Sequence, residues 1–146
     1  MAEQNIRLTG NQLAQLANQE RQKLAQINNR IGSIQGLRSE MQAAKDALEE
    51  IAKSSKGDEM LVNLGAGVYL KAIVSENSKA IAPVAGNAFA EKNTEELAKQ
   101  MEKKLENLDM SMENIAVEQE KIMVRINQLE QIMEAGMRAI RGGAGK

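Results

Sequence analysis

The ionisable side chains of this chain are carboxylates, amines, guanidinium groups and the phenol of one Tyr, because the sequence holds no Cys and no His. The commonest general base near neutral pH and two common metal ligands are therefore missing. Glu49 and Glu50 are neighbours, but adjacent residues on a helix point in different directions and form no acid–base pair. Gly65-Ala66-Gly67 could approach a phosphate, yet the Lys-Ser/Thr of a P-loop and a following helix are both missing. We expect no catalytic residue, no metal, no cofactor and no enzymatic activity.

The composition excludes further classes of function. Basic residues number 19 and acidic residues 20, a balance that argues against nucleic-acid binding. No apolar run reaches the roughly 18 residues of a membrane span, and we expect neither a signal peptide nor a membrane partner. The lack of Cys fits a reducing compartment, and we expect the cytoplasm. With one Tyr, one Phe and no Trp, a large globular core is not expected, and stability should depend on oligomerisation.

The later part of the chain carries an apolar pattern with alternating steps of four and three, which predicts a coiled-coil seam. Asn93 and Glu96 have the spacing of a capping box, and Arg141 precedes a pair of glycines that should stop the helix. We predict a helix over about Asn93–Arg141. Its seam residues are Met101, Leu105, Leu108, Met112, Ile115, Gln119, Ile122, Ile126, Leu129, Met133, Gly136 and Ile140.

The first part of the chain carries a second seam, and capping signals at Thr9 and Gly57 predict a helix over about Thr9–Ser54. Two consecutive steps of three meet at Ile34, which predicts a stammer that overwinds the coil. The stammer could make the helix locally less stable in the middle of the arm, or it could be a harmless irregularity, and both interpretations are open. The two rows of this seam are Ile6, Leu13, Glu20, Ile27, Ile34, Met41 and Leu48, and Leu16, Leu24, Ile31, Leu37, Ala44 and Ile51.

The segment between the two helices reads as strands and turns. Val68–Val74 alternates side chains to two faces, and Met60–Leu64 is a shorter apolar run before it. Lys79–Val84 and Ala88–Glu91 predict a second hairpin, with Pro83 at an edge or a strand end. Four short strands cannot bury their faces alone, so we expect this segment to pair with other subunits. The expected oligomerisation residues are Leu61, Val62, Leu64, Val68, Leu70, Ala72, Val74, Ile81, Val84 and Phe89.

Two helices of similar length with a compact connection predict a mainly α fold with a small β segment, in which the arms form a long antiparallel coiled-coil hairpin. A parallel dimer of separate coils is the competing arrangement. We divide the chain into an N-terminal coiled-coil helix (1–56), two β-hairpins that oligomerise into a β-barrel (57–92) and a C-terminal coiled-coil helix (93–146).

Apolar residues leave the seam near the ends of the two arms, where Met123 and Val124 also lie outside it. Surplus apolar surface of this kind is a plausible site for promiscuous binding, and Met suits it because its side chain is flexible. A broadened seam is the alternative. Glu20 interrupts the seam nearby, and we expect it to snorkel past the seam rather than to loosen the pair. The expected binding residues are Ile6, Leu8, Leu13, Leu16, Ile132, Met133, Met137 and Ile140.

These elements together resemble the α class of prefoldin subunits, which has two hairpins where the β class has one. The segment Leu61–Ala72 is similar to the α-class motif of an apolar strand, Gly-Ala-Gly and a second strand that ends in Lys-Ala. Glu91-Lys92 before the capped helix also matches. Asn63 departs from the Pro often found there, and Val84-Ala85-Gly86 replaces the usual Val-Gly-Ala-Gly. The short chain resembles the archaeal type.

The resemblance implies an ATP-independent chaperone subunit. Two α and four β subunits would form a hexamer with a double β-barrel body, and the coiled-coil tips would hold non-native client proteins and deliver them to a group II chaperonin. A structural coiled-coil adaptor that docks one specific folded partner is the alternative function.

Overall fold

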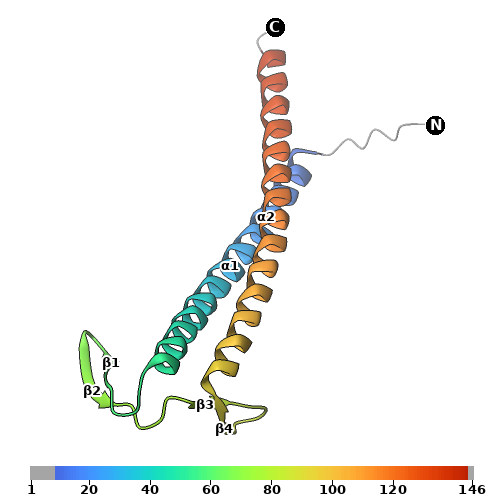
Figure 1. Ribbon diagram of the computed structural model, residues 1–146. Coiled ribbons are helices and arrows are strands. Elements are labelled where there is room, and N and C mark those ends of the chain that lie inside the picture. Colours follow the sequence, from blue (N-terminus) through green and yellow to red (C-terminus); the bar gives the residue numbers. More distant parts are fainter. Residues whose placement is uncertain (1–8, 145–146) are drawn as a thin grey trace, which may run out of the picture. The chain divides into compact units, whose positions relative to one another are not determined.

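The computed structural model of the protein describes residues 9–144, with side chains described for residues 9–142. Two long helices enclose two β-hairpins in the chain (Figure 1), which confirms the predicted fold class. The elements in chain order are α1 (Gly10–Lys53), β1 (Glu59–Gly65), β2 (Val68–Ile73), β3 (Lys79–Pro83), β4 (Phe89–Asn93) and α2 (Thr94–Ala144). No helix within the described residues combines the length and the apolar character that a membrane crossing needs.

The chain forms two compact units, and each contains a part of both helices. We call Met1–Ile34 with Met110–Lys146 the terminal unit, and Gln35–Asp109 the hairpin unit. All four strands lie in the hairpin unit. In the terminal unit the two helices pack through Ile27, Ile115 and Ile122. The helices of the hairpin unit pack through Leu48, Leu97 and Ala98, joined by Ala82 of β3.

Polar caps set the helix starts close to the predicted positions. The Thr9 amide donates to Gln12 Oε1 at 2.8 Å and the Gln12 amide donates to Thr9 Oγ1 at 3.3 Å, a complete capping box. Asn93 Oδ1 accepts from the amides of Glu95 and Glu96 at 2.9 and 3.2 Å. The predicted stop before Gly142 is wrong, because α2 continues through the glycines to Ala144.

The predicted seam of α2 is confirmed as far as Met133. From Met101 to Met133 every seam residue is buried or half-buried and the residues between them are exposed. Gln119 occupies its seam position by donating from Nε2 to Asn28 Oδ1 of α1 at 2.8 Å. Gly136 and Ile140 are exposed, and the prediction that the seam includes them is wrong. Figure 1 shows the reason: α2 continues beyond the first turn of α1, so among the described residues its last turns have no helix opposite them.

The seam of α1 differs from the prediction at two points. Ala17 is fully buried while Leu16 is 37% exposed, and Leu37 is 42% exposed while Arg38 is half-buried. With Ala17 and Arg38 on the seam, the steps alternate four and three from Leu13 to Met41, with no slip at Ile34. The predicted stammer at Ile34 is therefore wrong, because it rested on assigning the leucines to the seam.

The two hairpins are antiparallel and each forms its own two-stranded sheet. In the turn between β1 and β2, Gly65, Ala66 and Gly67 have φ angles of 100°, 53° and 78°. Side chains disfavour this left-handed region, which explains the glycines on both sides of Ala66. The register shifts between Asn63 and Gly65, where Asn63 Oδ1 accepts from the Gly65 amide at 2.8 Å.

Hydrogen bonds join the segment between the hairpins to both helices. Asn77 Nδ2 donates to the carbonyls of Ala52 and Ser54 at 3.3 and 2.5 Å, which satisfies acceptors at the end of α1. The Asn77 carbonyl in turn accepts from Thr94 Oγ1 at 2.9 Å, and the Thr94 amide donates to the Ser78 carbonyl at 3.0 Å. Thr94 is only 1% exposed. The end of α1 and the start of α2 are therefore tied through one short loop.

Candidate functional sites

The predicted binding residues near the arm ends fall into two groups. Leu13 and Met133 lie on the seam, buried and half-buried respectively, and belong to the packing of the terminal unit. Ile6 and Leu8 lie outside the described residues. The remaining four are exposed at 37–74%: Leu16, Ile132, Met137 and Ile140.

Interhelical bonds show that the arms run antiparallel in the terminal unit, as predicted. Arg21 Nη2 donates to Glu130 Oε1 at 2.7 Å. Together with the Asn28–Gln119 bond, this pairing matches the early part of α1 with the late part of α2. Within the described residues, the two arms of one chain therefore pair with each other, whereas the competing prediction of a parallel dimer would need separate coils.

Glu20 does not snorkel out of the seam. The residue is 9% exposed, and its Oε1 accepts from Lys23 Nζ at 3.0 Å. Its Oε2 has no hydrogen-bond partner within the described residues, and Arg125 Nη1 of α2 lies 3.9 Å away. A carboxylate is shorter than the long cationic side chains that snorkel, so its charged end stays inside the helix pair.

One face of the β1–β2 hairpin carries only apolar side chains. Because side chains alternate along a strand, the register groups Met60 and Val62 with Leu70 and Ala72, and Val68 follows on the same side of β2. Leu64 lies next to this group, at the register shift. Among these, Leu64, Val68 and Leu70 are 55–60% exposed. The opposite face mixes polar residues with Leu61, Tyr69 and Ile73. We call the first set the open apolar face, since within the described residues no helix covers it.

The β3–β4 hairpin has the opposite arrangement. Its alanine face packs on the helix ends, where Ala82 is 5% exposed beside Leu48 and Leu97. Ile81 and Phe89 point to the other face and are 73% and 70% exposed.

Two further predicted oligomerisation residues differ from each other in exposure. Val84 is 36% exposed, whereas Val74 is 7% exposed and packs within its own chain. The Val74 amide and carbonyl bond to Asp58 and Gly57, which closes the base of the first hairpin.

Sequence reasoning placed Val124 outside the seam but missed that it belongs to a column of apolar residues on the outer side of α2. Met110, Val117 and Val124 are 48–62% exposed and are spaced by seven residues. That spacing places them on one face of the helix, away from the seam. The signal was present in the sequence, but the stronger seam pattern concealed it. We call these three residues the outer column.

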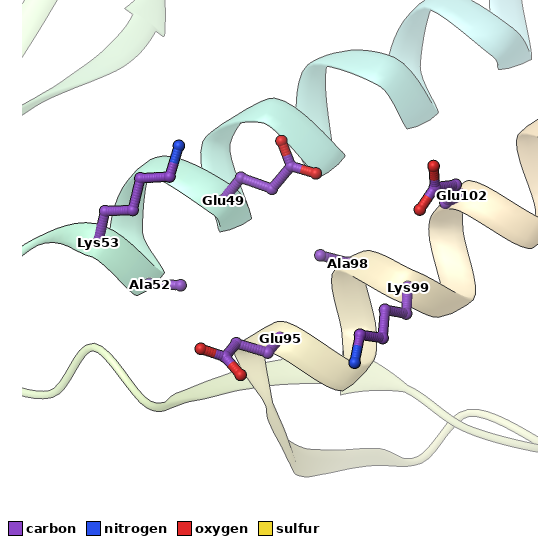
Figure 2. A pocket seen from close by; sticks show the side chains of 7 residues that line it. All are labelled: Glu49, Ala52, Lys53, Glu95, Ala98, Lys99 and Glu102. Atoms are coloured by element: carbon purple, nitrogen blue, oxygen red, sulfur yellow. The ribbon is translucent and has the colours of Figure 1, made fainter.

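A pocket lies between the end of α1 and the start of α2 in the hairpin unit (Figure 2). Ala52 and Ala98 face each other across it, and their small side chains leave the space open. Charged side chains from both helices surround the alanines: Glu49, Lys53, Glu95, Lys99 and Glu102. These charges nearly balance and include no activated nucleophile, so we assign the pocket no chemistry.

The ion pair between Arg38 and Asp109 shifts the pKa values of both residues. Asp109 of α2 accepts from Arg38 Nε at 2.6 Å and from Nη2 at 3.4 Å. These hydrogen bonds hold the pKa of Asp109 below its ordinary value and raise the pKa of Arg38. Both side chains are about half exposed, so the pair contributes modestly to stability.

These sites present apolar surface rather than reactive groups. The hairpins expose it on two small sheets and the terminal unit exposes it along α2. The molecule belongs to the class of proteins in which two coiled-coil arms are joined by β-hairpins and both parts expose apolar surface.

Comparison with known proteins identifies the family. The family described as Prefoldin subunit matches residues 20–137, and the chain belongs to the prefoldin family. Prefoldin subunit alpha of Thermofilum pendens is 28% identical over 105 residues, which cover 72% of this chain and 81% of that protein. Prefoldin subunit alpha 1 of Methanocaldococcus jannaschii is 33% identical over 88 residues, which cover 60% of this chain and 59% of that protein. These relatives confirm the resemblance to the α class of archaeal type.

A solved structure shares the fold. The cryo-EM structure of filamentous PFD from Methanocaldococcus jannaschii matches with a TM-score of 0.65 at 17% identity, over 81% of this chain and 98% of that one. The family match and the α-class relatives make the protein an α-class prefoldin chaperone subunit, and prefoldin is a chaperone family rather than an enzyme family.

Proposed function

We propose that this subunit holds non-native polypeptides without ATP, at the ends of its coiled-coil arms, and passes them to a group II chaperonin. The observation that carries the proposal is the exposed apolar surface of the terminal unit, where Ile132, Met137 and Ile140 are 54–74% exposed beyond or beside the seam. Exposed apolar side chains in a monomeric surface are costly to keep in contact with water, and they bind the apolar segments that unfolded chains present.

We propose that the hairpin segment, residues 57–92, is the assembly element. The open apolar face of β1–β2 and the exposed Ile81 and Phe89 of β3–β4 would be buried between subunits. Two-stranded sheets are marginal alone and leave edges that other strands can pair with. Two copies of this chain with four β-class subunits would then form a hexamer around a double β-barrel. We place this complex in the cytoplasm, where the absence of Cys carries no disadvantage.

The alternative function, an adaptor that docks one folded partner, is favoured by a different observation. The outer column of Met110, Val117 and Val124 offers a second apolar stripe in mid-arm. A partner that used it would not depend on the arm ends.

The experiment that tests the proposal compares two triple variants in a complex with β-class subunits. One variant carries Ile132→Ser, Met137→Ser and Ile140→Ser, and the matched control carries Met110→Ser, Val117→Ser and Val124→Ser. Suppression of light scattering is measured after a chemically denatured protein is diluted into each complex. We expect the arm-end variant to need at least about tenfold more complex, because each lost apolar contact weakens holding by roughly 1 kcal/mol.

The control variant should hold clients as the wild type does. Equal holding by the arm-end variant would contradict the proposed site. Normal assembly without any holding by the wild type would favour the adaptor.

A further inference from the structure

The outer column of α2 lies on the side of the helix that faces away from the seam. Met110, Val117 and Val124 are 62%, 52% and 48% exposed, whereas the seam residue Ile115 packs on Ile27 of α1. A row of apolar residues that recurs every seven positions is one half of a coiled-coil contact, because this spacing keeps one stripe facing a neighbouring helix. The spacing therefore selects a helix as the occupant of the outer column.

The surface of the outer column has the form that receives a side chain from such a helix. A shallow hollow lies on it, lined by Val117, Glu120, Lys121, Val124 and Arg125. All of these residues belong to α2, so the hollow lies on one helix rather than between two. The first four have the spacing i, i+3, i+4 and i+7, which is the spacing of the four residues around a hole in knobs-into-holes packing.

The two edges of the outer column differ in charge. Around Val117, the positions i−4 and i+3 lie along one side of the helix face, and the positions i−3 and i+4 lie along the other. Glu113 and Glu120 therefore form one edge, and Asn114 and Lys121 form the opposite edge. All four side chains are exposed. A helix that docks on the column must match an acidic edge and an edge with a cation and an amide at the same time.

A second copy of this chain matches both edges when its α2 runs parallel. A two-fold axis along the two helices sets the acidic edge of each copy against the opposite edge of the other, at the same height. Glu120 then meets Lys121 of the second copy, and Glu113 meets Asn114 of the second copy, each twice. An antiparallel pair would bring like edges together and set Glu113 against Glu120, which repel. We propose that two copies of this chain pair in parallel through their outer columns.

Lys121 of each copy occupies the hollow of the other. Its aliphatic stem lies against Val117 and Val124, and its ammonium lies beside Glu120. The apolar part of this contact is small, since three side chains from each copy bury less than the roughly 800 Å² per partner of a standard interface. The pairing is therefore weak between free chains and stronger where an assembly already holds two copies close together. It uses none of the arm-end residues, so it goes beyond the proposed function and does not depend on it.

Disulfide trapping tests the pairing, because the chain has no Cys of its own. Met110→Cys, Val117→Cys and Val124→Cys are oxidised separately, in the full-length chain alone and mixed with Cys-free β-class subunits. A parallel pair sets each column residue opposite its own counterpart, within reach of a disulfide, so each variant should form a covalent dimer. Ala116→Cys is the matched control, since Ala116 is exposed but lies about 100° around the helix from Val117. It should dimerise at least about tenfold more slowly.

Charge reversal tests the edges of the column separately. In the Val117→Cys background, Lys121→Glu sets two carboxylates against each other and should slow dimer formation about threefold or more. Adding Glu120→Lys to the same chain restores an opposite-charge pair and should recover most of the rate. A loss that the second change does not recover would show that these two residues do not meet between copies.

Three further results would overturn the inference. Equal rates for Val117→Cys and Ala116→Cys would show that the column does not pair. Disulfides between Met110→Cys and Val124→Cys chains, with none in either variant alone, would show an antiparallel pair. Protection of Val117→Cys from a maleimide reagent without dimer formation would show a different occupant, such as a β-class arm or a folded partner. The light-scattering experiment on denatured clients decides the proposed function independently, because it depends on the arm ends.

Discussion

The two β-hairpins of this protein have similar lengths but opposite relations to their own helices. The β3–β4 hairpin packs its alanine face on the ends of α1 and α2, with Ala82 only 5% exposed. The β1–β2 hairpin leaves the open apolar face uncovered, with Val68 and Leu70 both 55% exposed. The difference teaches that β3–β4 completes its own subunit through its alanine face, whereas we propose that the open apolar face of β1–β2 is covered by another subunit. Small side chains allow close packing within the chain, and large ones suit contact between chains.

The largest expected effect is the loss of assembly with β-class subunits when charges are placed on the open apolar face. Val62 and Leu70 are opposite each other in the β1–β2 register. Val62→Asp with Leu70→Asp would bury two carboxylates between subunits, which costs roughly 4 kcal/mol or more of association free energy. We expect loss of the complex with β-class subunits in size-exclusion chromatography. Leu61→Asp, on the mixed face, is the control and should assemble better than the double variant. Poorer assembly of Leu61→Asp than of the double variant would contradict the assignment of the open apolar face to assembly.

A smaller effect, on the free energy of unfolding, should follow from a larger side chain on the alanine face of β3–β4. Ala82→Leu adds bulk where β3 meets Leu48 and Leu97, and overpacking of this kind costs about 1–3 kcal/mol. Chemical denaturation at a fixed protein concentration measures the free energy of unfolding. Ala88→Leu, at an exposed position between the same strands, should change it by less than about 0.5 kcal/mol. Equal tolerance of both changes would mean that β3–β4 is not held by the helices.

The hydrogen bond from Thr94 to the Asn77 carbonyl in the loop should contribute less to the free energy of unfolding. Thr94→Val keeps the shape but removes the Oγ1 donor, leaving the Asn77 carbonyl without this partner. We expect a loss of about 1 kcal/mol of unfolding free energy. Thr94→Ser, which keeps the hydroxyl, should recover most of the loss. A Thr94→Val protein as stable as the wild type would show that the hydrogen bond from Thr94 to the Asn77 carbonyl does not stabilise the packing of β3–β4 on the helices.

The smallest effect should come from the exposed ion pair at the border of the same unit. Because the pKa of Asp109 is lowered in the folded state, its contribution is present above the ordinary pKa of Asp and is lost as the pH falls through the lowered value. Asp109→Asn should therefore lower the melting temperature slightly at neutral pH and have no effect in strong acid. A difference that grows as the pH falls would contradict this sign.

Much of the fold could be predicted from the sequence, because α2 repeats its apolar residues in an unbroken pattern and the hairpins alternate clearly. The seam of α1 could not, since the choice between Leu16 and Ala17, or Leu37 and Arg38, depends on the helix opposite. Leucine is the more apolar residue at both places, but the regular four-three spacing places Ala17 and Arg38 inside. Arg38 is tolerated there because Asp109 accepts from it.

The candidate sites were predictable in part for the same reason. Apolar residues outside a seam, such as Ile132 and Met137, can be recognised from spacing alone, whereas the burial of Val74 depends on how the hairpin base closes. The unsatisfied oxygen of Glu20 depends on the rotamers of three side chains from two helices. Sequence indicates that a charge interrupts the seam, and only the structure shows which of its atoms lacks a partner.

The central claim is that the hairpins make this chain a subunit of a larger complex. Native mass spectrometry tests it most directly, on the chain alone and mixed with the β-class prefoldin subunit of an archaeal relative. We predict a hetero-oligomer that contains two copies of this chain and four of the β-class subunit. A stable monomer in both samples would contradict the account.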